Sequence, residues 1–174
     1  MGSNPTLSAI TSLLNSPLLR ILWRPDEGWE RVRALDPGWL RSLGAIVPLA
    51  VLPALTGPFA TTFVFCVIAV VVAAGAIYAL APVFAVRRHW QHAMAVAAYS
   101  SVPVFLASPL IASPTLTILV IAAFFHSCVL CSFGLRRVLR CRGEDAAMYV
   151  AAAGFVAAVA GLVLGGLSSA AGIL

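Results

Sequence analysis

The chain has 174 residues, of which 61% are hydrophobic and 10% are charged, and its mean hydropathy is +1.01. A soluble domain carries about 25% charged residues, so this composition excludes a chain that covers a globular surface with polar groups. The formal net charge is +5, and all 11 basic residues are arginines. We therefore expect an all-α, polytopic membrane protein.

Residues 1–41 are predicted to form a cytoplasmic, interfacial segment. Apolar residues recur at helical spacing between Leu7 and Leu14, which places them on one face of a helix. Pro17 interrupts this pattern, and the apolar residues resume up to Trp23. This pattern predicts an amphipathic helix that lies on the membrane surface, with Trp23 at headgroup depth.

A second short helix is expected before the membrane domain. Pro25 is followed by Asp26 and Glu27, and acidic residues after a proline are typical of a helix start. Trp29 lies in this helix and Trp39 at the mouth of the first apolar run. We expect both tryptophans to be interface anchors.

Five apolar runs follow in residues 42–174, and a spanning helix needs roughly 20 mostly apolar residues. They do not alternate polar and apolar residues, so helices are favoured over barrel strands. The sequence therefore predicts a bundle of five transmembrane helices. These spans cover residues 43–57, 59–86, 93–112, 115–135 and 146–174.

Arginines are confined to the segment before the first span and to the connections after the second and fourth spans. With five spans, all three segments fall on one side of the membrane. The positive-inside rule makes that side cytoplasmic. We expect a multi-pass membrane protein with its N-terminus in the cytoplasm and its C-terminus outside.

The connection after the fourth span carries the densest charge, a cluster of four arginines: Arg136, Arg137, Arg140 and Arg142. Its first role is to set the topology. Contact with anionic lipid headgroups is a second role, worth about 1 kcal/mol per arginine near such a surface. Because topology accounts for the net charge, the sequence does not imply nucleic acid as a partner.

The third span has a polar centre. Tyr99, Ser100 and Ser101 precede Pro103, which frees a backbone carbonyl one turn earlier. Proline-broken helices near the midplane are typical of transporters. Serine hydroxyls also bond back to their own helix, so a structural kink explains the same residues.

Two groups of residues have metal-binding chemistry. Cys128 and Cys131 share a helix face, and His126 lies nearby in the same span. His89 and His92 form a second pair at i and i+3, beside two arginines. Core packing explains the first group equally well, and placement at the membrane interface explains the histidine pair. No cofactor is expected.

Small residues recur every four positions in the last span, and Gly161 and Gly165 form a G-x-x-x-G motif. Such a face lets helix backbones approach closely. Its partner is another span, a second copy of the chain or another membrane protein.

Three stretches together resemble the Ypt-interacting-protein (Yip) family of multi-spanning membrane proteins, in its bacterial form. They are "LLRILWRPDEGWERV", "AVAAYSSVPVF" and "FGLRRVLRCRGEDAAMYVAAAG". The most useful element consists of Ala98, Tyr99 and Pro103. The resemblance implies five spans, a cytoplasmic N-terminus and a place in the bacterial cytoplasmic (inner) membrane. Eukaryotic relatives act in vesicle trafficking and bind small GTPases through longer N-termini, so that partner is not carried over.

Three functions follow from these observations. The first is a membrane-organising or adaptor protein that acts through its interfacial and cytoplasmic segments, with membrane lipids among its partners. The second is a small transporter or channel with a path near the third span. The third is a metal-binding or redox protein that uses His126, Cys128 and Cys131. Because no catalytic set of residues is present, we do not expect an enzyme.

Overall fold

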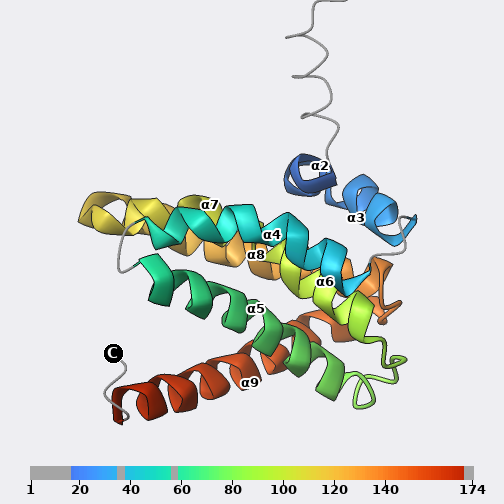
Figure 1. Ribbon diagram of the computed structural model, residues 1–174. Helices are drawn as coiled ribbons and strands as arrows, with labels where there is room; N and C mark the ends of the chain where they lie inside the picture. The colour runs from blue at the N-terminus through green and yellow to red at the C-terminus, as the bar shows by residue number, and fades with distance from the viewer. Residues whose placement is uncertain (1–16, 35–37, 56–58, 171–174) are drawn as a thin grey trace, which may run out of the picture.

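The computed structural model describes residues 17–34, 38–55 and 59–170, and every regular element in these ranges is helical (Figure 1). The expected helix between Leu7 and Leu14 lies outside the described residues. The elements are α2 (Pro17–Trp23), α3 (Pro25–Ala34), α4 (Trp39–Ala54), α5 (Phe59–Leu80), α6 (Trp90–Ser100), α7 (Val102–Ala107), the 3-10 turns η1 (Ser108–Ala112) and η2 (Pro114–Leu116), α8 (Thr117–Arg137) and α9 (Gly143–Ala170).

Four helical stretches of the described chain are long and apolar enough to cross a membrane. The fifth expected span, α4, has 16 residues and would extend about 24 Å, which is less than the roughly 30 Å of a bilayer core. It nevertheless runs alongside the longer helices (Figure 1). The spanning stretches are Thr62–Leu80, Trp90–Leu110, Thr117–Arg137 and Gly143–Ala160.

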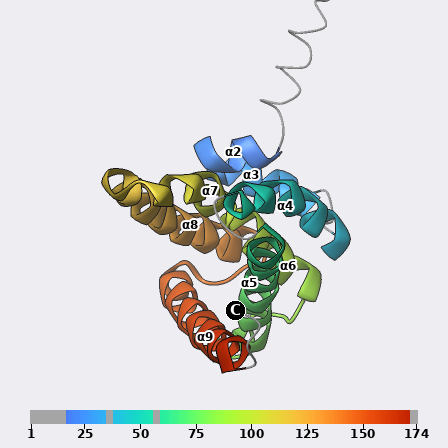
Figure 2. The ribbon, with the colours of Figure 1, turned by 60° about the vertical axis from the view of Figure 1, so that its left-hand side comes forward.

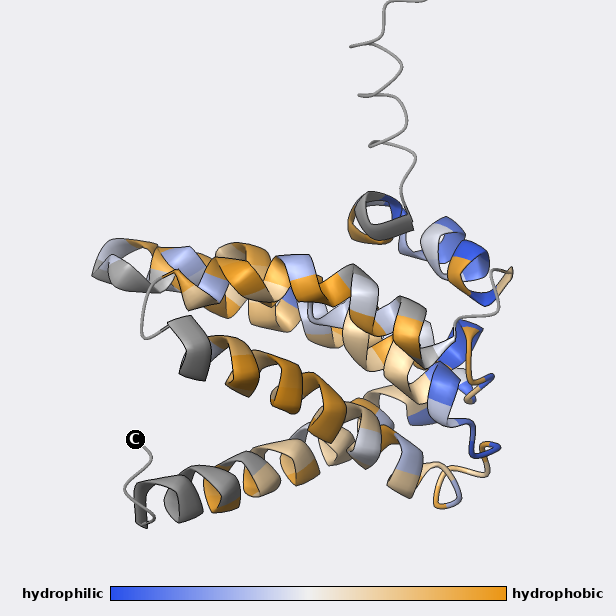
Figure 3. Cartoon of the chain, viewed as in Figure 1, coloured by the Kyte–Doolittle hydropathy of each residue, from blue (hydrophilic) through white to orange (hydrophobic). Residues whose placement is uncertain are grey.

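Successive long helices run back and forth, so their connections alternate between the two ends of the bundle (Figure 1). Hydrophilic residues gather at one end, in α3 and in the connections from α5 to α6 and from α8 to α9 (Figure 3). This arrangement agrees with the prediction that the arginine-bearing segments share one side.

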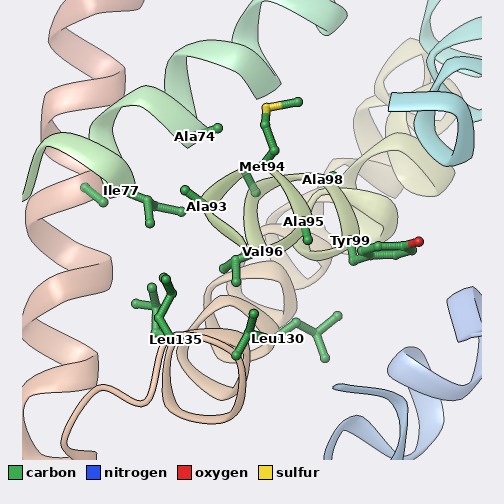
Figure 4. Packing of buried hydrophobic residues seen from close by; sticks show 14 of the residues in the cluster. Ala74, Ile77, Ala93, Met94, Ala95, Val96, Ala98, Tyr99, Leu130 and Leu135 are labelled. Atoms are coloured by element: carbon green, nitrogen blue, oxygen red, sulfur yellow. The ribbon is translucent and has the colours of Figure 1, made fainter. Parts of the chain in front are cut away.

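Helix α6 forms the centre of the bundle. In the stretch that begins with α6, 72% of the residues are buried, against 22% or fewer in the other three spanning stretches. Alanines line much of α6, and small side chains let neighbouring helices approach closely. Val96 points toward Leu130 and Leu135 of α8, while Ala93 faces Ile77 of α5 (Figure 4).

Helix α9 packs mainly on α5 and, to a smaller extent, on α8 (Figure 2). Tyr149 of α9 is fully buried, and its hydroxyl donates a hydrogen bond to the backbone carbonyl of Ile77. The ring of Phe84 stacks on Tyr149 with 4.4 Å between the centroids. These contacts fasten the last helix to the bundle beside its charged end.

Helix α5 ends at Leu80, earlier than the predicted end of the second span at residue 86. Pro82 has no backbone N–H and cannot continue the helical pattern. Ala85 then adopts a left-handed conformation with a φ of 54°, and the N–H of Val86 reaches back to the carbonyl of Ala81 at 2.9 Å. This is the hydrogen bond that closes a Schellman-type helix end.

The predicted proline break in the third span is confirmed. Helix α6 ends at Ser100, and α7 begins at Val102 with Pro103 in its first turn. The span continues into η1 as far as Leu110. The predicted start of the second short helix is also confirmed, because Asp26 and Glu27 lie in the first turn of α3.

Candidate functional site

Helix α3 is docked onto the charged end of the bundle through Trp29. This side chain is fully buried, so the expectation that it anchors the protein at the membrane interface is wrong. Its ring meets Tyr99 edge-on with 6.3 Å between the centroids. It also lies over Gly134 of α8, where an added Cβ would come within 2.8 Å of the ring. Trp29 therefore joins α3 to both α6 and α8.

An ion pair reinforces this docking at its edge. Arg137, at the end of α8, donates from Nε and Nη2 to Oδ1 of Asp26 at 3.1 and 2.7 Å. Its Nη1 lies 3.5 Å from a carboxylate oxygen of Glu30. All three side chains are largely exposed, and exposed pairs add little stability by themselves. We infer that the pair fixes the orientation of α3, whereas the buried tryptophan holds it in place.

The other arginines of the cluster have different surroundings. Arg136 lies over Gly143, where an added Cβ would sit 3.3 Å from its Nη2. The backbone carbonyl of Arg142 accepts the N–H groups of Asp145 and Ala146 at the start of α9. Arg140 turns the chain with a left-handed φ of 56°. The four residues of the cluster therefore have different structural surroundings, in addition to the charge that each contributes.

Arg140 lines a cavity of about 480 Å³ at the same end of the bundle. We call it the basic cavity, because three segments of the chain bring positive side chains to it. Arg33 comes from α3, and Arg140 from the α8–α9 connection. The remaining polar residues, Arg87, His89 and His92, come from the connection between α5 and α6 and from the first turn of α6.

The floor of the basic cavity is apolar. Val86, Val138 and Leu139 are buried there, whereas the three arginines are exposed around them. Arg33 follows Trp29 by four residues, which places the two side chains on one face of α3. The docking that buries Trp29 therefore also brings Arg33 to the cavity.

The polar residues of the third span are satisfied locally. Ser100 Oγ donates to the carbonyl of Val96 at 2.6 Å, and Ser101 Oγ donates to that of Ala98 at 2.8 Å. Tyr99 packs against Trp29, and Pro103 is buried at the start of α7. These contacts account for the polar centre as part of the helix packing.

A second, apolar pocket of about 400 Å³ lies between α5, α6, α8 and α9. Ser100, Ser101, Cys128 and Cys131 all line it, so the structure brings together residues that the sequence placed in separate groups. Ser127 also lines this pocket, and its buried hydroxyl has no hydrogen-bond partner in the described part of the chain.

The described residues contain no group of three or more His, Cys, Asp or Glu side chains that could hold a metal ion. His126 lies in a different hollow from Cys128 and Cys131, beside Pro103 and Trp23. The rings of His89 and His92 lie 5.2 Å apart, but arginines surround them in the basic cavity. Positive neighbours disfavour a bound cation.

Cys141 lies between two arginines of the cluster, outside the spanning helices. Burial raises the pKa of its thiol, and the carboxylate of Asp145 raises it further. A raised pKa keeps this thiol protonated at neutral pH, and the protonated form is a poor nucleophile and metal ligand. The side chain therefore acts as a packing residue.

The small-residue face of α9 is described in part. Ala153 is buried and Ala157 packs against the core. Gly161 and Gly165 belong to α9, but their surroundings lie outside the described part of the structure.

Sequence reasoning missed Arg33 and Arg87 as site residues, because both were interpreted only as topology signals. The sequence did offer one signal for a shared site, because the predicted topology places all arginine-bearing segments on one side of the membrane. Which arginines line one cavity depends on how α3 packs, and its docking residue, Trp29, was assigned to the membrane interface.

The charged end and the long apolar helices define a multi-pass, all-helical membrane protein. The Yip1 domain family model matches residues 19–165. The chain therefore belongs to the Yip family, and the resemblance drawn from its sequence is confirmed. No curated protein and no solved structure matches it.

Proposed function

We propose that this chain is a non-enzymatic membrane-organising or adaptor protein that acts through its interfacial helices and charged connections. The observation that carries this proposal is the docking of α2 and α3 by Trp29 and Arg137. Docking holds α3 on the charged end of the bundle and places α2 beside α7, where Trp23 lines a hollow with Pro103 and His126. It leaves Trp23 85% exposed, with Arg24 and Glu27 beside it at the surface. Tryptophan and arginine are enriched at protein–protein interfaces, which supports a contact surface for a partner here.

We further propose that the protein crosses the bacterial inner membrane five times, with the charged end in the cytoplasm. The arginine-bearing segments share one end, which supports this orientation through the positive-inside rule. Helix α4 lies alongside the longer helices, which supports its assignment as the fifth pass. The partners in this proposal are membrane lipids together with a second copy of the chain or another membrane protein.

A photo-cross-linking amino acid at position 23 tests the proposal in living cells. We expect discrete protein adducts with cytoplasmic or membrane proteins, because this position is exposed on the docked helices. The same probe in a Trp29→Ala background should lose these adducts while the protein still inserts. A probe at Phe155, which is 71% exposed on α9, is the matched control.

Two results would contradict this proposal. Adducts confined to lipid at position 23, or a pattern unchanged by Trp29→Ala, would argue against an adaptor surface. Adducts with proteins from outside the cytoplasm would argue against the orientation.

A transporter is the second candidate function, supported by the apolar pocket that Ser100, Cys128 and Cys131 line. It is the weaker candidate for two reasons. The residues that line this pocket include no charged side chain, and ion coupling normally needs one within the membrane. The hydroxyl of Ser100 is also already engaged within its own helix.

A further inference from the structure

We propose that the basic cavity binds a phosphate group, and that a lipid headgroup at the membrane surface presents it. This inference does not depend on the adaptor function. It rests on the charge of the cavity, on the geometry of its donors and on its position in the bundle.

The first argument is the imbalance of charge. Among the described residues, no acidic side chain lines the basic cavity. Three of the described acids are already paired with arginines elsewhere: Asp26 and Glu30 with Arg137, and Glu27 with Arg20 and Arg24. Three positive side chains around one cavity repel each other unless an anion offsets their charge. These side chains are Arg33, Arg87 and Arg140.

The second argument is the kind of donor. The guanidinium group of arginine presents a planar fork that matches phosphate oxygens. A carboxylate has two oxygens and is satisfied by one such fork, whereas a phosphate group offers enough oxygens for donors from several directions. The basic cavity brings three arginines from separate segments of the chain, together with the imidazoles of His89 and His92.

The third argument is the backbone around these donors. Helix α6 begins at Trp90 beside the cavity, and its N-cap residue, His89, makes no side-chain capping bond. The N-terminus of a helix carries a partial positive charge and unpaired N–H groups that favour anions. Ala85 and Arg140, which both line the cavity, have left-handed φ values. Both residues turn the chain after a helix, and these turns bring the connections that follow α5 and α8 to the cavity.

The fourth argument is position. The cavity lies between the end of α5 and the end of α8, where two apolar spans give way to charged connections. Lipid headgroups occupy this depth of a bilayer. The buried floor of Val86, Val138 and Leu139 suits the glycerol part of a lipid better than it suits a fully hydrated ion.

Calorimetric titration of the full chain in phosphatidylcholine nanodiscs tests this inference, with dioctanoyl phosphatidic acid as the probe. The test variant combines Arg33→Gln, Arg87→Gln and Arg140→Gln. The matched control combines Arg31→Gln, Arg88→Gln and Arg142→Gln, which removes the same charge from arginines that do not line the cavity. We expect the test variant to bind about 100-fold more weakly, at about fivefold per arginine that contacts the phosphate, and the control to weaken far less, because its arginines act only through the general charge of the surface.

Arg87→Gln alone is a milder variant in case the triple variant does not fold, and it should weaken binding about fivefold. Competition with inorganic phosphate identifies whether a lipid headgroup or a soluble compound supplies the bound phosphate group. Failure of millimolar phosphate to displace the lipid would assign the site to a headgroup, and displacement would assign it to a soluble phosphate compound. Equal weakening in the test and control variants, or unchanged binding in both, would overturn the inference.

Discussion

Trp29→Ala is expected to release α2 and α3 from the bundle. The substitution removes a fully buried indole that contacts α6 and α8, and truncating a buried tryptophan costs about 3–5 kcal/mol. The exposed ion pair of Arg137 contributes too little to hold the two helices alone. The spanning helices do not depend on this contact, so the variant should still insert.

Hydrogen–deuterium exchange in nanodiscs measures this release. Backbone amides of α2 and α3 should exchange faster in the variant, while those of α6 and α8 should change little. Trp23→Ala is the matched control, because it removes the same side chain from a position that is 85% exposed. Equal exchange in α3 for both variants would contradict the docking role of Trp29.

Gly28→Ala is expected to separate α2 from α3. An added Cβ at Gly28 would lie 2.6 Å from Cγ1 of Ile21 and 2.7 Å from its Cα. Because part of this clash is with backbone, a side-chain rotation cannot relieve it. The strain should cost about 1–3 kcal/mol, which exceeds the gain in helix propensity from alanine.

The separation should appear as faster exchange and easier proteolysis within α2. Gly154→Ala is the control, because a Cβ there would meet nothing within 4 Å. That change should leave the protein as stable as the wild type or slightly more stable. If Gly28→Ala behaved in the same way, the close packing of the two helices would be wrong.

Much of the fold could be predicted from the sequence, because membrane helices leave a strong signal. The lengths of the apolar runs, the arginines at one end and the proline break before α7 are local features that need no tertiary information. The end of α5 was predicted too late, because the residues after Leu80 stay apolar. Pro82 stops the helix and a left-handed residue at Ala85 turns the chain after it, and hydropathy does not report backbone conformation.

The site was harder to predict, because its residues come together only through docking. Trp29 is a tryptophan in a short, charged helix, and this pattern is typical of an interface anchor. Hydropathy cannot distinguish a side chain that is buried against protein from one that is buried against lipid. Gly134 provides the space for its ring, yet the two residues are far apart in the sequence. Without this contact, Arg33 cannot be placed beside Arg87 and Arg140.

Fluorescence quenching of a single-tryptophan protein tests the docking of α3 most directly. Trp23, Trp39 and Trp90 would be replaced by phenylalanine to leave Trp29, and a protein that keeps only Trp23 serves as the exposed control. The docked structure predicts that neither aqueous iodide nor brominated lipid quenches Trp29, because no part of its side chain is exposed to water or lipid. Quenching of Trp29 by either agent to the extent seen for Trp23 would contradict the account.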